Sequence, residues 1–586
     1  MRSRTRVSVV VVAAAWALAL GACSALPLPG QGNGDGSPEP RRTSTAYIEA
    51  QDPHAEAPAP QVAKARSGGT LRVLSANSPH TFDPTRVSPL DTLAIMKLVT
   101  RGLTQTVYEG GNPVLVPDMA TDLGRPNRDF TRWEFTLRDG LRYEDGAPVK
   151  AVDVAYAITR QFAQQELSGG PTYGLDYYLG GDTYAGPYAD DGDFEAVETP
   201  DDKTIIVKMR RPFPSMRYYA SLPTFTPIPA AKDTRQDYTR HPLATGPYKF
   251  AADWNGRTLT LVKNREWSAS MDPGRHQFVD TFIFEFGLDE NEIQQRIITD
   301  EGDDQYALSY NDLLADNYPV IRGTDVENRL VVGPSPCISY LWMDTRTIPL
   351  SVRRAVAEAW PLKAENEAAG SIPGLTWQPA TTIMASATPG WLAHDAIGNQ
   401  GKGNGDPSAA RTLLEEAGQL GFELSFFSSD DDTETAIAEV RRKALTKAGF
   451  TVKTVPAPSA LARDLASDGT RPVNLRSGRW CMDWANGDAV LPAILDGRKA
   501  HLPGAPIPSF LNVDRVNAEI DRISRLPADK ALAEWGRLDA MIMDEYLPVV
   551  PLGEEGTTLL HGSKVANVIV DTVGGSPDYT QIYVLE

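Results

Sequence analysis

Short runs of β-branched and aromatic residues alternate along the chain with apolar stripes of helical period, and this alternation restricts the possible folds more than any other feature. Thr204–Met209 (TIIVKM) and Thr281–Phe286 (TFIFEF) are typical of strands. A helix is predicted in the segment DPSAARTLLEEAG, where Asp406 can cap the first turn, Pro407 fits that turn and Gly418 ends the helix. No internal repeat is detectable, so the sequence predicts an α/β fold.

The N-terminus has the pattern of an export signal. Three arginines among the first six residues precede the apolar run Val7–Leu20, which is followed by small residues. A transmembrane anchor is the alternative, but the run is shorter than the roughly 20 residues that cross a bilayer. The sequence LGAC, ending at Cys23, resembles a lipobox. We therefore expect residues 1–22 to be removed and Cys23 to be acylated, which would anchor the protein to the extracytoplasmic face of the cell membrane.

Residues 23–66 are rich in Pro, Gly, Ser, Ala and charged residues and have no hydrophobic period, so they are predicted to form a flexible linker. The remaining chain of roughly 520 residues is long enough for more than one domain. A formal net charge of −19 argues against nucleic acid as a partner and against binding to anionic lipid through a basic patch.

The sequence carries no signature of catalysis. There is no zinc-protease helix motif, no nucleophile elbow and no phosphate loop, and the seven histidines are not at metal-ligand spacing. We therefore predict a binding protein rather than an enzyme, with no metal and no cofactor.

The chain has three cysteines. With Cys23 assigned to the lipid, Cys337 and Cys481 remain, and an exported protein allows them to pair. Counting alone leaves a disulfide and two separate buried thiols equally open.

Six blocks of sequence occur in a family's own order. They are Pro117–Arg160, Arg211–Pro229, Leu243–Trp267, Arg346–Trp360, Asp406–Gly418 and Ile542–Leu552. They resemble the oligopeptide- and dipeptide-binding proteins, the family 5 bacterial extracellular solute-binding proteins. Because six collinear blocks are specific, the chain is identified as a member of that family.

This resemblance implies a two-lobed, type II periplasmic-binding-protein-like fold with an extra third domain. Lobe I would consist of residues 67–90, 240–336 and 553–586. The extra domain would consist of residues 91–239, and lobe III, which carries the ligand segment, would consist of residues 337–552. The two lobes would close around a ligand by a hinge motion.

The resemblance also implies a ligand site. Peptide-binding members carry Trp-Cys-x-Asp and then an aromatic residue, a pattern that Trp480, Cys481, Asp483 and Trp484 match here. By the same resemblance, Asp483 would receive the α-ammonium of a peptide, although it could instead cap a turn or pair with Arg479. The aromatic residues would line the pocket and suit variable side chains.

A second segment of the resemblance, CISYLWMDT, begins at Cys337 and contains Tyr340. The resemblance implies that Tyr340 lines the pocket and that Cys337 and Cys481 form a disulfide, the pair that is bridged in oligopeptide-binding relatives. The alternative for Tyr340 and Trp480 is a place in the core.

Three positions depart from the family pattern. Arg101 stands where the family usually has Glu, Ala489 stands where Pro is common, and Ser78 or a neighbour stands at an acidic ligand-contact position of some members. The ligand class is therefore open.

The leading hypothesis is a monomeric, lipid-anchored receptor of an ABC importer in a Gram-positive-type envelope, which captures peptides and delivers them to a membrane permease. The first alternative is the same scaffold with a non-peptide solute, such as an oligosaccharide, opine, metallophore or antibiotic-like compound. The second is an exported enzyme, chaperone or sensory accessory protein.

Overall fold

The computed structural model describes residues 50–87, 90–109, 112–189, 192, 194–398, 403–429, 431–458, 471, 473–500 and 507–586. These residues belong to one compact unit, Arg41–Glu586. The predicted signal peptide, the predicted lipidation site Cys23 and the part of the predicted linker before Ala50 lie outside the described residues.

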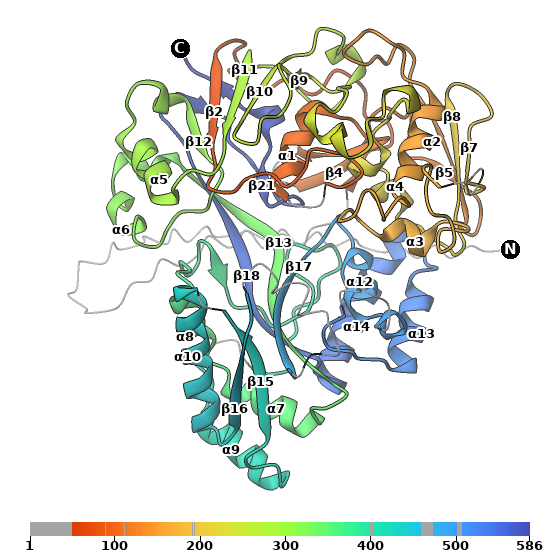
Figure 1. The fold of residues 1–586 in the computed structure, drawn as a ribbon. Helices are drawn as coiled ribbons and strands as arrows, with labels where there is room; N and C mark the ends of the chain where they lie inside the picture. Colours follow the sequence, from red (N-terminus) through yellow and green to blue (C-terminus); the bar gives the residue numbers. More distant parts are fainter. Residues whose placement is uncertain are drawn as a thin grey trace, which may run out of the picture. The chain divides into compact units, whose positions relative to one another are not determined.

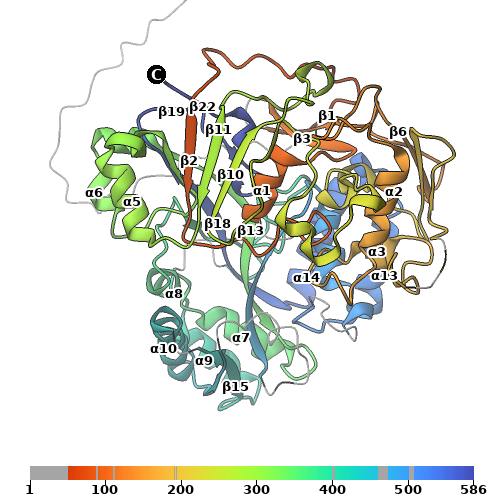
Figure 2. The ribbon, with the colours of Figure 1, turned by 45° about the horizontal axis from the view of Figure 1, so that its top comes forward.

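Five strands form the β2 sheet, in the order β12-β2-β11-β10-β9 (Figures 1 and 2). Their bounds are β2 Thr70–Leu74, β9 Tyr248–Phe250, β10 Thr258–Lys263, β11 Thr281–Glu285 and β12 Ala307–Ser309. Strand β2 runs parallel to both of its neighbours, and β10 is antiparallel to both of its own. Side chains alternate across a strand, so Phe282 and Phe284 of β11 enter one core, where they join Leu98 of helix α1 (Leu90–Val99).

The C-terminal segment returns to this core. Strand β19 (Val565–Ala566) pairs with β22 (Tyr583–Val584), and β20 (Val570–Asp571) pairs with β21 (Ser576–Pro577) as a hairpin. Helices α5 (Glu290–Thr299) and α6 (Tyr318–Ile321) lie in the same part of the molecule, beyond β12 (Figure 1). The start and the end of the described chain therefore stabilise one core.

The β6 sheet has the order β5-β6-β8-β7. Its strands are β5 Arg125–Pro126, β6 Arg132–Thr136, β7 Val197–Glu198 and β8 Thr204–Lys208, and the nearby helices are α2 Ala151–Arg160, α3 Tyr173–Tyr177 and α4 Met216–Tyr219. Trp133 and Phe135 of β6 are buried with Ile158 of α2 in one apolar cluster. A smaller sheet, β1-β4-β3, consists of β1 Ala50–Gln51, β4 Asn112–Pro117 and β3 Thr104–Glu109.

The β13 sheet has the order β14-β18-β13-β17. Its strands are β13 Leu330–Met343, β14 Trp377–Gln378, β17 Leu475–Cys481 and β18 Val549–Leu560. The helices of this region are α7 Leu350–Ala359, α8 Leu362–Ala368, α9 Pro407–Glu416, α10 Asp432–Lys447, α12 Leu491–Leu495, α13 Asp514–Ile523 and α14 Ala528–Glu545. The parallel pair β15 (Glu423–Ser428) and β16 (Thr451–Pro456) lies beside α9 and α10 (Figure 1). As predicted, Asp406 caps α9, and its carboxylate accepts hydrogen bonds from two backbone N–H groups.

Strands β13 and β18 are long enough to connect two cores. They pair antiparallel, with a register shift between Pro334 and Ile338. At one end Leu560 of β18 belongs to an apolar cluster with Leu74 of β2, and at the other end Val549 belongs to the core of the β13 sheet. The two strands thus link the two cores, and a register shift interrupts their ladder between them.

The segment from Ala50 to Arg66 differs from the prediction of a flexible linker. Ala50–Gln51 pairs in parallel with β4, and the Gln51 side-chain amide donates a hydrogen bond to the Tyr218 hydroxyl at 2.7 Å. Ala59 is buried, and its N–H donates to the Asp272 carbonyl at 3.0 Å. Composition could not reveal these contacts, because backbone hydrogen bonds to an existing strand edge offset the ordering entropy whatever the side chains are.

Candidate ligand-binding site

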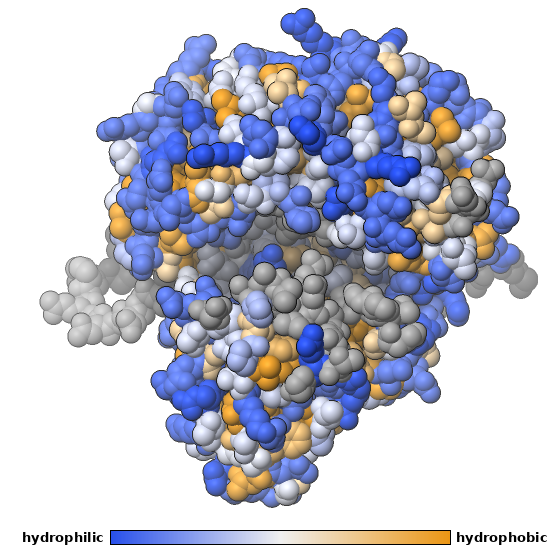
Figure 3. Space-filling view, viewed as in Figure 1, coloured by the Kyte–Doolittle hydropathy of each residue, from blue (hydrophilic) through white to orange (hydrophobic). Residues whose placement is uncertain are grey.

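A pocket with a volume of about 130 Å³ lies where distant segments of the chain meet. It is lined by α1, by β3, by the turn that follows α4, by the two residues after β17 and by the β20–β21 hairpin. The charged side chains in its lining are Lys97, Arg275, Asp483 and Asp571. On the face seen in Figure 3, hydrophilic residues dominate, hydrophobic residues are scattered, and the surface is recessed across its middle. Charged groups of both signs thus surround a space of small-molecule size.

Asp483 lies in this pocket and interacts with a residue that sequence reasoning missed. The Tyr173 hydroxyl, from α3, donates a hydrogen bond to the Asp483 carboxylate oxygen Oδ2. Burial and the nearby Asp483 carboxylate raise the pKa of Tyr173 well above its ordinary value. Tyr173 is therefore a neutral donor at any physiological pH, and it fixes the orientation of the Asp483 carboxylate.

Trp484 fills an aromatic cluster rather than the pocket. It is 2% exposed, and its indole N–H donates to Asp488 Oδ1 at 2.7 Å. The rings of Tyr173, Tyr219 and Phe213 surround it, with centroid distances of 4.9, 6.1 and 6.2 Å. Trp484 therefore packs the end of β17 against α3 and α4, and it supports Asp483 through the backbone they share.

The other two predicted aromatic residues also lie outside this pocket's lining. The indole N–H of Trp480, which is half-buried, donates to the Ala489 carbonyl at 2.9 Å. Tyr340 on β13 is 1% exposed, and its hydroxyl donates to the Ile383 carbonyl. The core alternative fits Tyr340 better, and a ligand contact of Trp480 stays a prediction.

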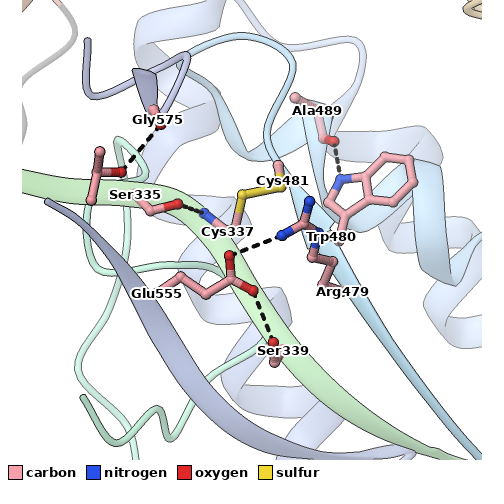
Figure 4. Close-up of a disulfide and its surroundings, with 10 residues drawn as sticks. Ser335, Cys337, Ser339, Arg479, Trp480, Cys481, Ala489, Glu555 and Gly575 are labelled. Atoms are coloured by element: carbon pink, nitrogen blue, oxygen red, sulfur yellow. Dashed lines mark hydrogen bonds and ion pairs between the residues drawn. A yellow bond between two sulfur atoms is a disulfide. The ribbon is translucent and has the colours of Figure 1, made fainter. Parts of the chain in front are cut away.

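Cys337 and Cys481 are joined by a disulfide with an S–S distance of 2.02 Å (Figure 4). The two residues face each other in the register of β13 and β17. Figure 4 also shows Arg479 in an ion pair with Glu555, at 3.3 Å. The disulfide thus ties the end of β17, and Asp483 two residues beyond it, to one of the two long strands.

Arg101, one of the departures from the family pattern, belongs to a buried ionic network. It contacts Asp118 at 2.7 Å and Asp272 at 3.5 Å, and Arg275 contacts the same two carboxylates at 2.9 and 3.2 Å. Burial favours the protonated form of Asp272, but the two guanidinium groups hold its pKa below its ordinary value. Arg101 is not among the described residues that line the pocket, so its effect on the pocket is indirect, through Arg275.

The other two departures also lie away from the pocket lining. Ser78 is exposed, and Ala489 is buried and accepts the Trp480 hydrogen bond. Neither is among the described residues of the lining.

The β20–β21 hairpin contributes functional candidates that the sequence did not reveal. Lys97 of α1 forms ion pairs with Asp578 at 3.2 Å and with Asp571 at 3.5 Å. The Tyr108 hydroxyl also donates to Asp571. These residues are separated by more than 450 positions, as the 463 between Tyr108 and Asp571 illustrate, so no local pattern could have joined them.

Neither a candidate metal site nor a membrane-spanning helix is found in the described part of the chain. It contains no group of three or more His, Cys, Asp or Glu side chains placed to hold a metal ion. None of its helices combines the length and the apolarity required to cross a bilayer.

The sequence model of the bacterial extracellular solute-binding proteins, family 5 (middle part), matches residues 114–501, which is more than half of the chain. The chain belongs to this family. The predicted membership is thereby confirmed, and the family consists of solute-binding receptors rather than enzymes.

Named relatives of this solute-binding protein cover most of its length. The probable D,D-dipeptide-binding periplasmic protein DdpA of Escherichia coli (strain K12) is 24% identical over 473 residues, 78% of this chain and 82% of the relative. The periplasmic oligopeptide-binding protein OppA of Salmonella typhimurium (strain LT2) is 25% identical over 409 residues, 66% of this chain and 70% of the relative.

Solved structures confirm the predicted fold class. The clavulanic acid biosynthesis oligopeptide binding protein 2 superposes with a TM-score of 0.82 at 26% identity, covering 93% of this chain and all of that one. The periplasmic binding protein DppA of Helicobacter pylori, solved in complex with the peptide STSA, has a TM-score of 0.69 at 19% identity and covers 89% of this chain and 99% of its own. The protein therefore has the type II periplasmic-binding-protein-like fold of family 5.

Proposed function

We propose that this solute-binding protein is the peptide receptor of an ABC importer, anchored by a lipid on Cys23 and acting as a monomer that delivers peptides to a membrane permease. The observation that carries the peptide assignment is Asp483, whose carboxylate lies in a pocket at the end of an edge strand. The names of the relatives, which are peptide-binding proteins, support the same assignment. The division into lobe I, the extra domain and lobe III at residues 91, 240, 337 and 553 is part of this proposal.

Asp483 is suited to an ammonium group for a physical reason. An ammonium that enters an enclosed pocket loses its hydration, and a hydrogen-bonded carboxylate offsets that cost better than a neutral acceptor does. The bond from Tyr173 to Oδ2 holds the carboxylate in one orientation before the ligand arrives. A preoriented carboxylate loses less entropy on binding.

Strand β17 is suited to the ligand backbone. Among the described strands it stands at one end of the β13 sheet, so one of its edges has no neighbouring strand. An extended peptide can add to such an edge through main-chain hydrogen bonds, which do not depend on the peptide's side chains. The strand leads directly to Asp483, so a peptide that pairs antiparallel to it would have its N-terminus near the carboxylate.

Native mass spectrometry of the protein purified without denaturation tests the peptide assignment. We expect a bound population whose masses and fragments are those of short peptides, removed by unfolding and refolding and restored by added tripeptide. A single non-peptide mass, together with no calorimetric response to a tripeptide library, would favour the alternative of a non-peptide solute.

A further inference from the structure

Gly478 lies inside the edge strand β17, although the strand does not need a glycine there. Glycine weakens a strand, because it loses more conformational freedom on folding than other residues and has no side chain to pack. The register between β17 and β13 is regular where Gly478 pairs with Tyr340, so the glycine marks no bulge in this ladder. Its φ also lies outside the left-handed region that favours glycine.

Packing does not require a glycine at this position either. A Cβ placed on Gly478 would meet no atom nearer than Nε1 of Trp342 at 3.4 Å, which is an ordinary contact distance. Every other described glycine with an ordinary φ would bring its Cβ to 3.1 Å or less from a neighbouring atom. Gly478 is exposed, and it stands on a strand that has no described neighbour on one side. A remaining reason for glycine in a strand is the close approach of a ligand or of another backbone.

Trp342, on the adjacent strand β13, offers a hydrogen-bond donor at the same place. The residue is 3% exposed, and the edge of its indole that carries Nε1 is the part nearest to Gly478. No described residue accepts a hydrogen bond from this N–H, although a buried indole N–H usually has a partner. The indole N–H groups of Trp133 and Trp535 also lack a described partner, but those two atoms are enclosed, whereas that of Trp342 is not.

We infer that Trp342 and Gly478 form a ligand contact, in which the indole N–H donates to a carbonyl oxygen that can approach because Gly478 has no side chain. This inference rests on the proposed function, in which an extended peptide pairs along the open edge of β17. Gly478 lies five positions before Asp483, and both strands advance about 3.3 Å per residue. A peptide with its N-terminus at Asp483 would therefore reach Gly478 with about its fourth or fifth residue. Trp342 then contributes affinity only to peptides of about that length or longer.

Calorimetry with all-alanine peptides of two to six residues tests this inference. Trp342→Phe keeps an aromatic ring and removes the N–H. Its affinity for the hexapeptide should fall by about 2- to 10-fold, the range for one neutral hydrogen bond, whereas its affinity for the dipeptide should not change. Gly478→Ala places a methyl group beside Nε1 and should weaken hexapeptide binding at least as much. The melting temperature of the empty Gly478→Ala protein should not fall, because the methyl group fits at an ordinary distance.

Trp254→Phe is the matched control, because Trp254 packs against the apolar cluster of the β2 sheet and is outside the pocket lining. It should leave the affinity for every peptide unchanged. Wild-type affinities of Trp342→Phe at all lengths would overturn the inference and leave the peptide function standing. Equal losses for the dipeptide and the hexapeptide would also overturn it, since the indole would then support the whole site rather than a distant carbonyl. No binding of any of these peptides to the wild type would refute the peptide function and this inference together.

Discussion

At the scale of single residues, two aspartates five positions apart stand in opposite environments. Asp483 lies in the pocket and is oriented by the Tyr173 hydroxyl. Asp488 is buried beside Trp484 and accepts a hydrogen bond from the indole N–H of that residue. Burial raises the pKa of Asp488 to about 6. The first is placed to meet a charged ligand, and the second is a structural acceptor that holds the aromatic cluster.

The first prediction concerns Asp483→Asn. Removing one member of an enclosed charge pair costs about 2–5 kcal/mol, so peptide affinity should fall by roughly 30- to several-thousand-fold. The melting temperature of the empty protein should barely change, because asparagine keeps an acceptor for Tyr173. Calorimetry with a free and an N-acetylated peptide measures the effect, and acetylation should weaken binding to the wild type far more than binding to the variant.

Asp488→Asn is the matched control for this experiment, since it makes the same chemical change at a buried carboxylate outside the pocket lining. It should leave the effect of acetylation at its wild-type size. Equal losses from acetylation in the wild type and in Asp483→Asn would show that Asp483 does not hold the ammonium.

The second prediction is a pH dependence of stability that arises at Asp488. Its folded-state pKa of about 6 lies above the ordinary value of 3.8, so the folded protein holds this proton more tightly than the unfolded chain does. The stability contributed by the protonated form is present at low pH and is lost as the pH rises through about 6. Between pH 5 and pH 7 the wild type should lose about 1 kcal/mol relative to Asp488→Asn. Urea unfolding of both proteins measures this, and parallel pH profiles would contradict it.

At the scale of elements, the disulfide and strand pairing act on the same pair of strands. Cys337 and Cys481 close a separation of 144 residues, and β13 and β17 are hydrogen-bonded neighbours at that point. The strand ladder orders the two segments in the folded protein, so the main effect expected of the covalent bond is to restrict the unfolded chain.

The third prediction follows from this restriction. Thiol counting on the denatured, non-reduced mature protein should find no free thiol from Cys337 or Cys481. The double variant Cys337→Ser/Cys481→Ser should lose up to about 4–5 kcal/mol of unfolding free energy in the chain-entropy model. Urea denaturation measures the loss. A double variant as stable as the wild type would mean that the unfolded chain is not restricted by the bond.

Sequence patterns predicted those elements whose signals are local. The helix after Asp406 has its cap, its first-turn proline and its terminating glycine in one segment, and the structure begins α9 at Pro407. The run Thr281–Phe286 was predicted to be a strand, and the structure has β11 at Thr281–Glu285, with burial that alternates along it. Ala50–Gln51 gave no such signal, because its pairing with β4 depends on a strand edge more than 60 positions away, at Val114 and Leu115.

The candidate site was predictable only where the family pattern reached it. That pattern pointed to Asp483 and to the two cysteines. It did not point to Tyr173, whose hydroxyl the fold brings to the Asp483 carboxylate, or to Lys97 and Asp571, which line the same pocket as Asp483. Tyr340 shows why two readings stayed open, because an aromatic residue on a central strand has the same sequence signature whether it packs in a core or lines a pocket.

At the scale of the whole molecule, β13 and β18 connect the core near β2 with the core of the β13 sheet, and the pocket collects side chains from both regions. Asp483 follows β17 in the β13 sheet, whereas Lys97 and Asp571 lie beside the β2 sheet. A ligand held by both regions would favour the arrangement in which they approach each other, and a permease could recognise that arrangement.

The last prediction concerns where this molecule is held. The segment LGAC resembles a lipobox, and acyl chains on Cys23 would contribute about 0.8 kcal/mol per buried methylene, enough for two or more chains to retain the protein on a membrane. Cys23→Ser should therefore move the protein from the membrane fraction to the soluble fraction and into the aqueous phase of a detergent partition. The variant Cys337→Ser/Cys481→Ser is the matched control, since it removes cysteines without touching the lipobox, and it should stay in the membrane fraction.

Mass spectrometry of the mature N-terminus adds an independent measurement, with Cys23 expected as the first residue and expected to carry acyl chains. Unchanged detergent partitioning of Cys23→Ser would contradict lipid anchoring and leave the ligand assignment untouched, because Asp483 and its pocket do not depend on how the protein is held at the membrane.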